Sequence, residues 1–132
     1  KVFAWLYNPK AKNKKLNQFM NRDKIYEKYY DGSVYTPYGR NIFVDEQKAL
    51  NYLIQSTSSD MLLRSAIRVD KILARKKSFV AFCIHDSVVL DMSSEDKDLL
   101  EKMISAFSNT EFGNMKTSVS IGKNFGDMRQ IL

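Results

Sequence analysis

The 132-residue sequence has few of the side chains that bind structural metals or cross-link a chain. It contains one cysteine, Cys83, and one histidine, His85, so an internal disulfide and a zinc site built on cysteine and histidine are both excluded. Metal-dependent phosphohydrolases that use a His-Asp pair are excluded as well, because they need several further histidines. The unpaired thiol lies in an apolar run and favours a reducing compartment, so we expect a cytoplasmic location.

Long apolar runs are missing too. No stretch approaches the roughly 18 residues that a membrane span needs, and no signal peptide is visible, so we expect no membrane partner. The chain begins at Lys1 and opens directly on the apolar "VFAWLY", which we interpret as a piece of a longer protein.

The composition that is present suits a packed domain, with 44% hydrophobic and 12% aromatic residues. The net charge of +6 points to an anionic partner. Much of the excess lies near the start, in Lys10, Lys12, Lys14 and Lys15. These lysines either contact phosphate or form a solvated basic helix face, and charge alone leaves both alternatives open.

The pattern of apolar residues predicts an α+β fold. After a short first helix that Pro9 bends or ends, we expect helices over 10–20 and 22–30, then a turn, a short strand and a turn in "YYDGSVYTPYGR". A long helix is expected over 45–75, with Asp45 as N-cap. Its apolar stripe consists of Leu62, Ala66, Val69 and Leu73, widened by Leu63 and Ile67.

The second half of the chain predicts two strands, 78–84 and 87–92, which form a buried hairpin. Ser93 or Ser94 then caps a helix that runs to about residue 107, with Glu95 and Asp96 in its first turn. The segment "KTSVSIG" is expected to be a last strand, and "KNFGDMRQIL" a short tail.

The hairpin places the dipeptide His85-Asp86 between its strands, in "SFVAFCIHDSVVLDM". A serine hydrolase would use Ser87 and His85 on one side of the strand, with Asp86 pointing away and the acid unidentified. A Mg²⁺ site fits the residue types better, because this ion takes carboxylates together with phosphate oxygens and water. On spacing alone, a polar turn without a metal is the better explanation of the dipeptide.

Five ordered blocks of this sequence resemble the fingers and palm of family A DNA polymerases, the bacterial DNA polymerase I group and its phage relatives. The blocks are "FAWLYNP", "GSVYTPYGR", "EQKALNYLIQSTSSD", "HDSVVLD" and "GKNF". They correspond to the end of the fingers helix, a palm turn, the long palm helix, the third polymerase motif on its hairpin, and a C-terminal motif.

The resemblance implies a polymerase palm with a small antiparallel sheet, a catalytic β-hairpin and packed helices. Residues 1–31 would form a partial fingers segment, and residues 32–132 the C-terminal part of the palm. The implied activity is template-directed nucleotidyl transfer by a two-metal mechanism with Mg²⁺. The implied partners are primer-template DNA, deoxynucleoside triphosphates and the missing N-terminal part of the polymerase.

The resemblance also implies roles for single residues. Asp86 would be the metal-binding aspartate, and His85 would contact the primer end. Asn51 and Gln55, four apart on one helix face, would donate to minor-groove acceptors that every correct base pair presents.

Phe3 would pack against the sugar of the incoming nucleotide, and Tyr7 would stack near the templating base. Arg40 would either contact nucleic-acid phosphate or brace the palm. Apart from the resemblance, Lys12 and Lys14 of the basic start are our candidates for contacts with DNA phosphate.

The match has gaps that predict a divergent, phage-like member. Ser87 replaces the family's glutamate, Gln47 an arginine, and Phe125 a tryptophan; Asn8 and Ser56 stand where glycines are usual. The first motif, D-x-S-x-x-E, which supplies the second metal-binding aspartate, is missing; "DMSSED" at 91–96 resembles it but follows the hairpin, so we treat it as a decoy. We therefore expect the isolated chain to be inactive.

Two other functions remain open. One is a palm remnant that binds nucleic acid without catalysis. The other is an interaction domain unrelated to nucleic acid, whose basic start only aids solubility.

Overall fold

The computed structural model describes Trp5, Asn8 and residues 10–132. These residues form helices and four small antiparallel sheets of two strands each, which confirms the predicted α+β class. The chain divides into two compact units, Lys1–Asp60 and Met61–Leu132. One helix, α4 (Glu46–Leu73), contributes residues to both units. The expected division into residues 1–31 and 32–132 concerns subdomains of a larger protein and stays a prediction.

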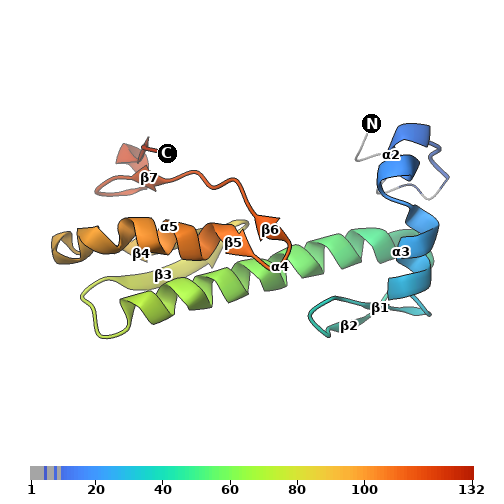
Figure 1. The fold of residues 1–132 in the computed structure, drawn as a ribbon, viewed down its shortest axis with the longest axis horizontal. Coiled ribbons are helices and arrows are strands. Elements are labelled where there is room, and N and C mark those ends of the chain that lie inside the picture. The colour runs from blue at the N-terminus through green and yellow to red at the C-terminus, as the bar shows by residue number, and fades with distance from the viewer. Residues whose placement is uncertain (1–4, 6–7, 9) are drawn as a thin grey trace. The chain divides into compact units, whose positions relative to one another are not determined.

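The first unit begins with two short helices and a hairpin (Figure 1). Both helices are capped by asparagine side chains: Asn13 accepts a hydrogen bond from the Leu16 amide, and Asn21 from the Lys24 amide. Because Asn13 caps the helix predicted over 10–20, this helix begins at Lys14, later than the sequence predicts. The elements are α2 (Lys14–Phe19), α3 (Arg22–Tyr29), β1 (Ser33–Tyr35) and β2 (Asn41–Phe43). Of the first predicted helix, before Pro9, the structure describes only Trp5 and Asn8.

The core of the first unit forms where α3 and the β1–β2 hairpin pack on the start of α4. Val34, Ala49 and Leu53 are buried together. Around them lie half-buried apolar and aromatic side chains: Ile25, Tyr26, Tyr29, Tyr30, Ile42 and Val44. Strand β2 is not predicted from the sequence, because its three residues are too few to show a period.

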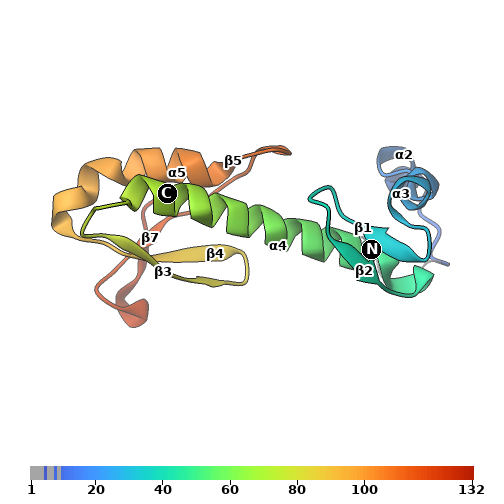
Figure 2. The same ribbon diagram turned by 90° about the horizontal axis from the view of Figure 1, so that it is seen from below.

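The second unit packs a hairpin and a helix along the second part of α4, as Figures 1 and 2 both show. The hairpin consists of β3 (Phe79–Ile84) and β4 (Ser87–Asp91), and the helix is α5 (Leu100–Ser108). Val69, Leu73 and Met103 form the buried centre. Around it lie Ile72, Val80, Leu90, Met92, Leu99, Leu100 and Phe107.

The apolar stripe of α4 is narrower than predicted. Ala66, Val69 and Leu73 are buried as expected, whereas Leu63 and Ile67 are 46% and 54% exposed. The hairpin and α5 cover the side of α4 that carries Val69 and Leu73. Leu63 and Ile67 are not covered by them. None of the helices in the described part of the chain combines the length and the apolar character that a membrane crossing requires.

The segment after the hairpin differs most from the prediction. The expected single helix consists of a 3-10 helix, η1 (Ser94–Leu99), followed by α5, and the backbone of Asp96 leaves helical geometry within η1. The predicted last strand shrinks to β7 (Ser120–Ile121), which pairs with β8 (Arg129–Gln130) in the segment predicted as a tail. The remaining short elements are β5 (Asn109–Thr110), β6 (Gly113–Asn114) and η2 (Phe125–Asp127).

Candidate active site

The His85-Asp86 dipeptide forms the two-residue turn that joins β3 to β4. The last strand pair is Ile84 with Ser87, so both dipeptide residues lie outside the ladder. His85 adopts a left-handed backbone conformation, with φ of 53°, which is costly for a residue with a Cβ. The paired strands therefore end in a tight turn that holds Asp86 at a defined place in the second unit.

The turn changes the side-chain relations expected for a regular strand. Strand alternation does not apply to turn residues, so it gives no support for placing His85 and Ser87 on one side. The Ser87 hydroxyl instead donates a hydrogen bond to Asp86 Oδ1, at 3.3 Å. A serine nucleophile would need a base as its neighbour rather than this carboxylate, so the contact does not favour a hydrolytic triad.

The hairpin is more exposed than the sequence predicts. His85, Asp86 and Ser87 are exposed, and Phe82 and Ile84 are 45% and 46% exposed. The reason is that only one face of this two-stranded sheet meets the core, through Val80 and Leu90. The prediction of a buried hairpin is therefore wrong for the end that carries the turn.

A β-bulge in β3 sets the direction of Phe82. Val80 pairs with Leu90 and Phe82 with Val89, so one extra residue, Ala81, is inserted between them. Paired residues share a face, so the bulge turns Phe82 away from the face that carries Val80. Phe82 stacks on Phe125, with ring centroids 6.1 Å apart and planes inclined by 29°. Phe125 belongs to "GKNF", so two of the five sequence blocks meet here.

The other end of the hairpin is closed by a buried hydrogen-bond network. Asp96 Oδ2 accepts hydrogen bonds from the Lys77 amide (3.1 Å), the Ser78 amide (2.9 Å) and the Ser78 hydroxyl (2.8 Å). The Ser78 hydroxyl oxygen also accepts from the Ser93 amide, at 2.9 Å. The network thus joins the residues before β3 to those after β4.

The same network explains the electrostatics of Asp96. The hydrogen bonds from the Ser78 amide and hydroxyl lower the pKa of Asp96 below its ordinary value, with a smaller contribution from the Lys77 amide, because they favour the ionised form. Asp96 is the last residue of "DMSSED", so the carboxylate stabilises the hairpin base. The interpretation of this segment as a decoy is consistent with that contact.

In the first unit, Arg40 and Asp60 connect two further sequence blocks. Arg40 Nε donates to Asp60 Oδ2 at 3.2 Å, and Arg40 Nη2 donates to Asp60 Oδ1, which makes a bidentate ion pair. This pairing raises the pKa of Arg40 further. The Arg40 amide donates to the Thr36 hydroxyl, at 3.1 Å, and Gly39 has a φ of 83°, which favours glycine. These contacts are those expected of an arginine that braces the turn.

The other predicted contacts with DNA and nucleotide lie in the first unit. Asn51 is half-buried and Gln55 is exposed, and both lie on α4 at the spacing that places them on one face. Lys12 and Lys14 are exposed. Phe3 and Tyr7 lie outside the described residues.

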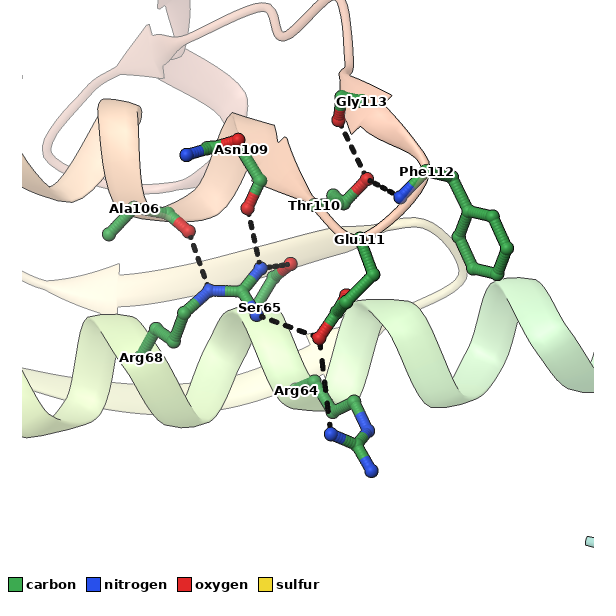
Figure 3. Close-up of polar contacts among 9 residues, drawn as sticks. All are labelled: Arg64, Ser65, Arg68, Ala106, Asn109, Thr110, Glu111, Phe112 and Gly113. Carbon is green, nitrogen blue, oxygen red and sulfur yellow. Dashed lines mark hydrogen bonds and ion pairs between the residues drawn. The ribbon is translucent and has the colours of Figure 1, made fainter. Parts of the chain in front are cut away.

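A cluster around Arg68 was missed in the sequence (Figure 3). Arg68 Nε donates to the Ala106 carbonyl (3.0 Å), and Arg68 Nη2 to the Asn109 carbonyl (2.9 Å), at the C-terminal end of α5. Carbonyls at the C-terminal end of a helix have no N–H donor within the helix, and the Arg68 guanidinium supplies the missing donors. Glu111 lies within 3.7 Å of Arg68 and 3.9 Å of Arg64. In the sequence, the only local sign of this cluster is that Arg64 and Arg68 lie one helical turn apart.

The described residues do not form a metal site by themselves. No group of three or more potential ligands from histidine, cysteine, aspartate and glutamate occurs in the part of the chain that the structure covers. Asp86 is a single exposed carboxylate, and Asp91 lies at the opposite end of β4, about 17 Å away at roughly 3.4 Å per residue. Asp86 can therefore provide one ligand, and a complete site needs carboxylates from elsewhere.

In chain order, the described residues present the braced arginine turn, the amide-bearing helix and the hairpin turn. The sequence model described as DNA polymerase family A matches residues 8–127, and the chain belongs to this family. At the family level this is a polymerase-type enzyme that acts on DNA and nucleotides, and its members generally use Mg²⁺. No curated protein and no solved structure gives a significant match.

Proposed function

We propose that the chain is the C-terminal palm portion, with part of the fingers, of a DNA-directed DNA polymerase. Family membership supports the activity class. The observation that carries the assignment to this chain is the position of Asp86 at the turn of a hairpin whose opposite end is closed by the Asp96 network. A carboxylate on such a support keeps its place while substrates enter and leave.

In this proposal Asp86 supplies one carboxylate to a Mg²⁺ site that is completed outside the chain. In such sites Mg²⁺ supplies activation of the primer 3′-hydroxyl and stabilisation of charge on the transferred phosphoryl group. Exposure of the Asp86 side chain supports this role, because a ligand of a shared site has to be accessible. His85, beside it, contacts the primer end.

The first unit holds the nucleic acid and the nucleotide. Asn51 and Gln55 donate to minor-groove acceptors of the nascent pair, which tests pair shape without reading sequence. Phe3 and Tyr7 contact the incoming nucleotide and the templating base.

Arg40 can brace the turn and contact DNA at once. A guanidinium has five N–H donors, and the pair with Asp60 uses only two of the three nitrogens. The Arg40 side chain is about half exposed, so the remaining donors are accessible to a phosphate. Lys12 and Lys14 add further phosphate contacts.

The test is Asp86→Ala in a polymerase that contains this chain. We expect loss of primer extension with little change in primer-template affinity, because the substitution removes a metal ligand and no DNA contact. The control is Asp91→Ala, an exposed aspartate at the other end of β4, which should keep extension. Extension that survives Asp86→Ala would show that the metal assignment is wrong.

The isolated chain provides a second test. One carboxylate cannot organise two Mg²⁺ ions, so we expect no primer extension by the purified 132 residues at any Mg²⁺ concentration. Measurable extension by the chain alone would contradict the proposal that a second carboxylate comes from outside.

The alternative function is a palm remnant that binds nucleic acid without catalysis. It is favoured by Ser87, which stands where the family has glutamate and donates its hydroxyl to Asp86. The same experiment separates the two: a parent protein that binds primer-template DNA but extends no primer, even before substitution, would support the alternative.

A further inference from the structure

The segment from Lys10 to Arg22 combines positive charge with an exposed aromatic ring. It contains no aspartate or glutamate, and its cationic residues are Lys10, Lys12, Lys14, Lys15 and Arg22. Phe19, at the end of α2, is 92% exposed, the largest exposed fraction among the large hydrophobic side chains that the structure describes. Exposing a phenyl ring to water is unfavourable, so its position beside several cations suggests that it contacts a ligand.

One side of helix α2, which carries Asn17, faces Trp5. Trp5 is 1% exposed, and its indole Nε1 donates to Asn17 Oδ1 at 2.8 Å. The Arg22 guanidinium lies over the Trp5 ring, 4.3 Å from its centroid. Leu16 and Met20 are half-buried. The helix is thus held at the face that carries Asn17, and Phe19, two residues further on, lies on the opposite face.

The outer face carries Lys15 and Phe19. They are four residues apart, so they are neighbours on the helix surface, with Gln18 beside them. All three are exposed. The ring is therefore an exposed apolar group beside a cationic and a polar side chain of the same helix face.

This combination fits unpaired nucleic acid. An aromatic side chain stacks on a base only where the face of that base is free, as in a single strand, while a nearby ammonium pairs with the backbone phosphate. In a duplex the faces of the bases are covered by their neighbours, so the ring would add nothing there. A purely electrostatic surface would bind both forms through lysine alone.

We propose that Lys15 and Phe19 on the outer face of α2 form a contact site for single-stranded DNA. Phe19 stacks on a base, and Lys15 pairs with a phosphate of the same strand. Beyond the proposed function, this segment would bind single-stranded rather than double-stranded DNA. That proposal rests on the proposed function only in taking DNA as the ligand.

The test is fluorescence anisotropy of the 132-residue chain with a labelled oligothymidylate and with a duplex of equal length. We expect Phe19→Ala to weaken single-strand binding about tenfold and duplex binding less than about twofold. Phe19→Trp should restore single-strand binding, because it keeps an aromatic face. Lys15→Gln should lower the slope of log K against log salt by about 0.7.

Phe43→Ala is the matched control. Phe43 is 87% exposed in the same unit, on the segment "NIFVDE", which contains two carboxylates and no lysine. Its loss should leave single-strand binding unchanged. Equal losses for Phe19→Ala and Phe43→Ala, equal losses on single strand and duplex, or no single-strand binding by the wild-type chain would each overturn the proposal. None of these readouts involves Asp86, so failure here is distinct from failure of the polymerase assignment.

Discussion

The two ends of the β3–β4 hairpin each carry an aspartate, and the two carboxylates have opposite surroundings. Asp96, at the base, is 6% exposed and accepts three hydrogen bonds. Asp86, at the turn, is exposed and accepts one hydrogen bond from its neighbour Ser87. The difference teaches that the hairpin is fixed by hydrogen bonds at its base, whereas its turn leaves a carboxylate exposed.

The largest effect should follow removal of the carboxylate at the base. Asp96→Ala leaves the amides of Lys77 and Ser78 and the Ser78 hydroxyl without their acceptor, so the free energy of unfolding should fall sharply. Asp86→Ala is the control and should change it by less than about 0.5 kcal/mol, as for exposed positions generally. Urea unfolding followed by circular dichroism measures both. Similar losses of unfolding free energy in Asp96→Ala and Asp86→Ala would show that the two ends of the hairpin do not differ as described.

A matched pair of serines gives the next effect. Ser78 is 1% exposed and both donates to Asp96 and accepts from the Ser93 amide. Ser78→Ala should therefore cost about 1–3 kcal/mol, the range for leaving buried partners unsatisfied. Ser87→Ala, at the exposed turn, should cost less than about 0.5 kcal/mol in the same unfolding experiment.

Acid should weaken the base of the hairpin without a substitution. The pKa of Asp96 is lower in the folded chain than its value of about 3.9 in an unfolded one. The stability that ionised Asp96 contributes is therefore fully present above about pH 4 and is lost as the pH falls through the folded pKa. Unfolding measured between pH 7 and pH 2 should show this loss. Asp96→Asn should be less stable at pH 7 and should lose less on acidification; an unchanged acid dependence in this variant would assign the loss to other carboxylates.

The smallest effect concerns the turn backbone. His85 has a positive φ, which costs a residue with a Cβ roughly 1 kcal/mol and a β-branched residue more. We expect His85→Gly to change the free energy of unfolding by less than about 1 kcal/mol and His85→Val to lower it by about 1–2 kcal/mol. Equal values for the two variants would show that the turn is not held in this conformation in solution.

The sequence predicted the features whose signal is local. The long helix begins directly after Asp45, and Ser93 caps the next helix by accepting from the Glu95 amide. The two hairpin strands differ from their predicted ranges by one residue at an end. Capping chemistry and apolar periodicity are properties of neighbouring residues, so one sequence is enough to read them.

Features that depend on residues far apart in the chain could not be predicted. The bond from the Ser78 hydroxyl to Asp96 spans 18 residues, and that from Arg68 to the Asn109 carbonyl spans 41. Asp96 looked like an ordinary acidic residue in a first helical turn, whereas its carboxylate binds Ser78 and its backbone is not helical. The strands of two or three residues, such as β5 to β8, form only because a partner segment is present.

The extra residue in β3 lets the hairpin tolerate a change of length at one position. The register shift lies at Ala81, whereas the pairing of Ile84 with Ser87 is set by the two-residue turn. Deleting Ala81 would leave the His85-Asp86 turn in place and keep Val80 and Phe82 on opposite faces, because neighbouring residues of a regular strand alternate. It would remove the local bend and extra twist that a bulge adds to its strand. Related chains that differ here by one residue would therefore keep both the core side chain and the ring that meets Phe125.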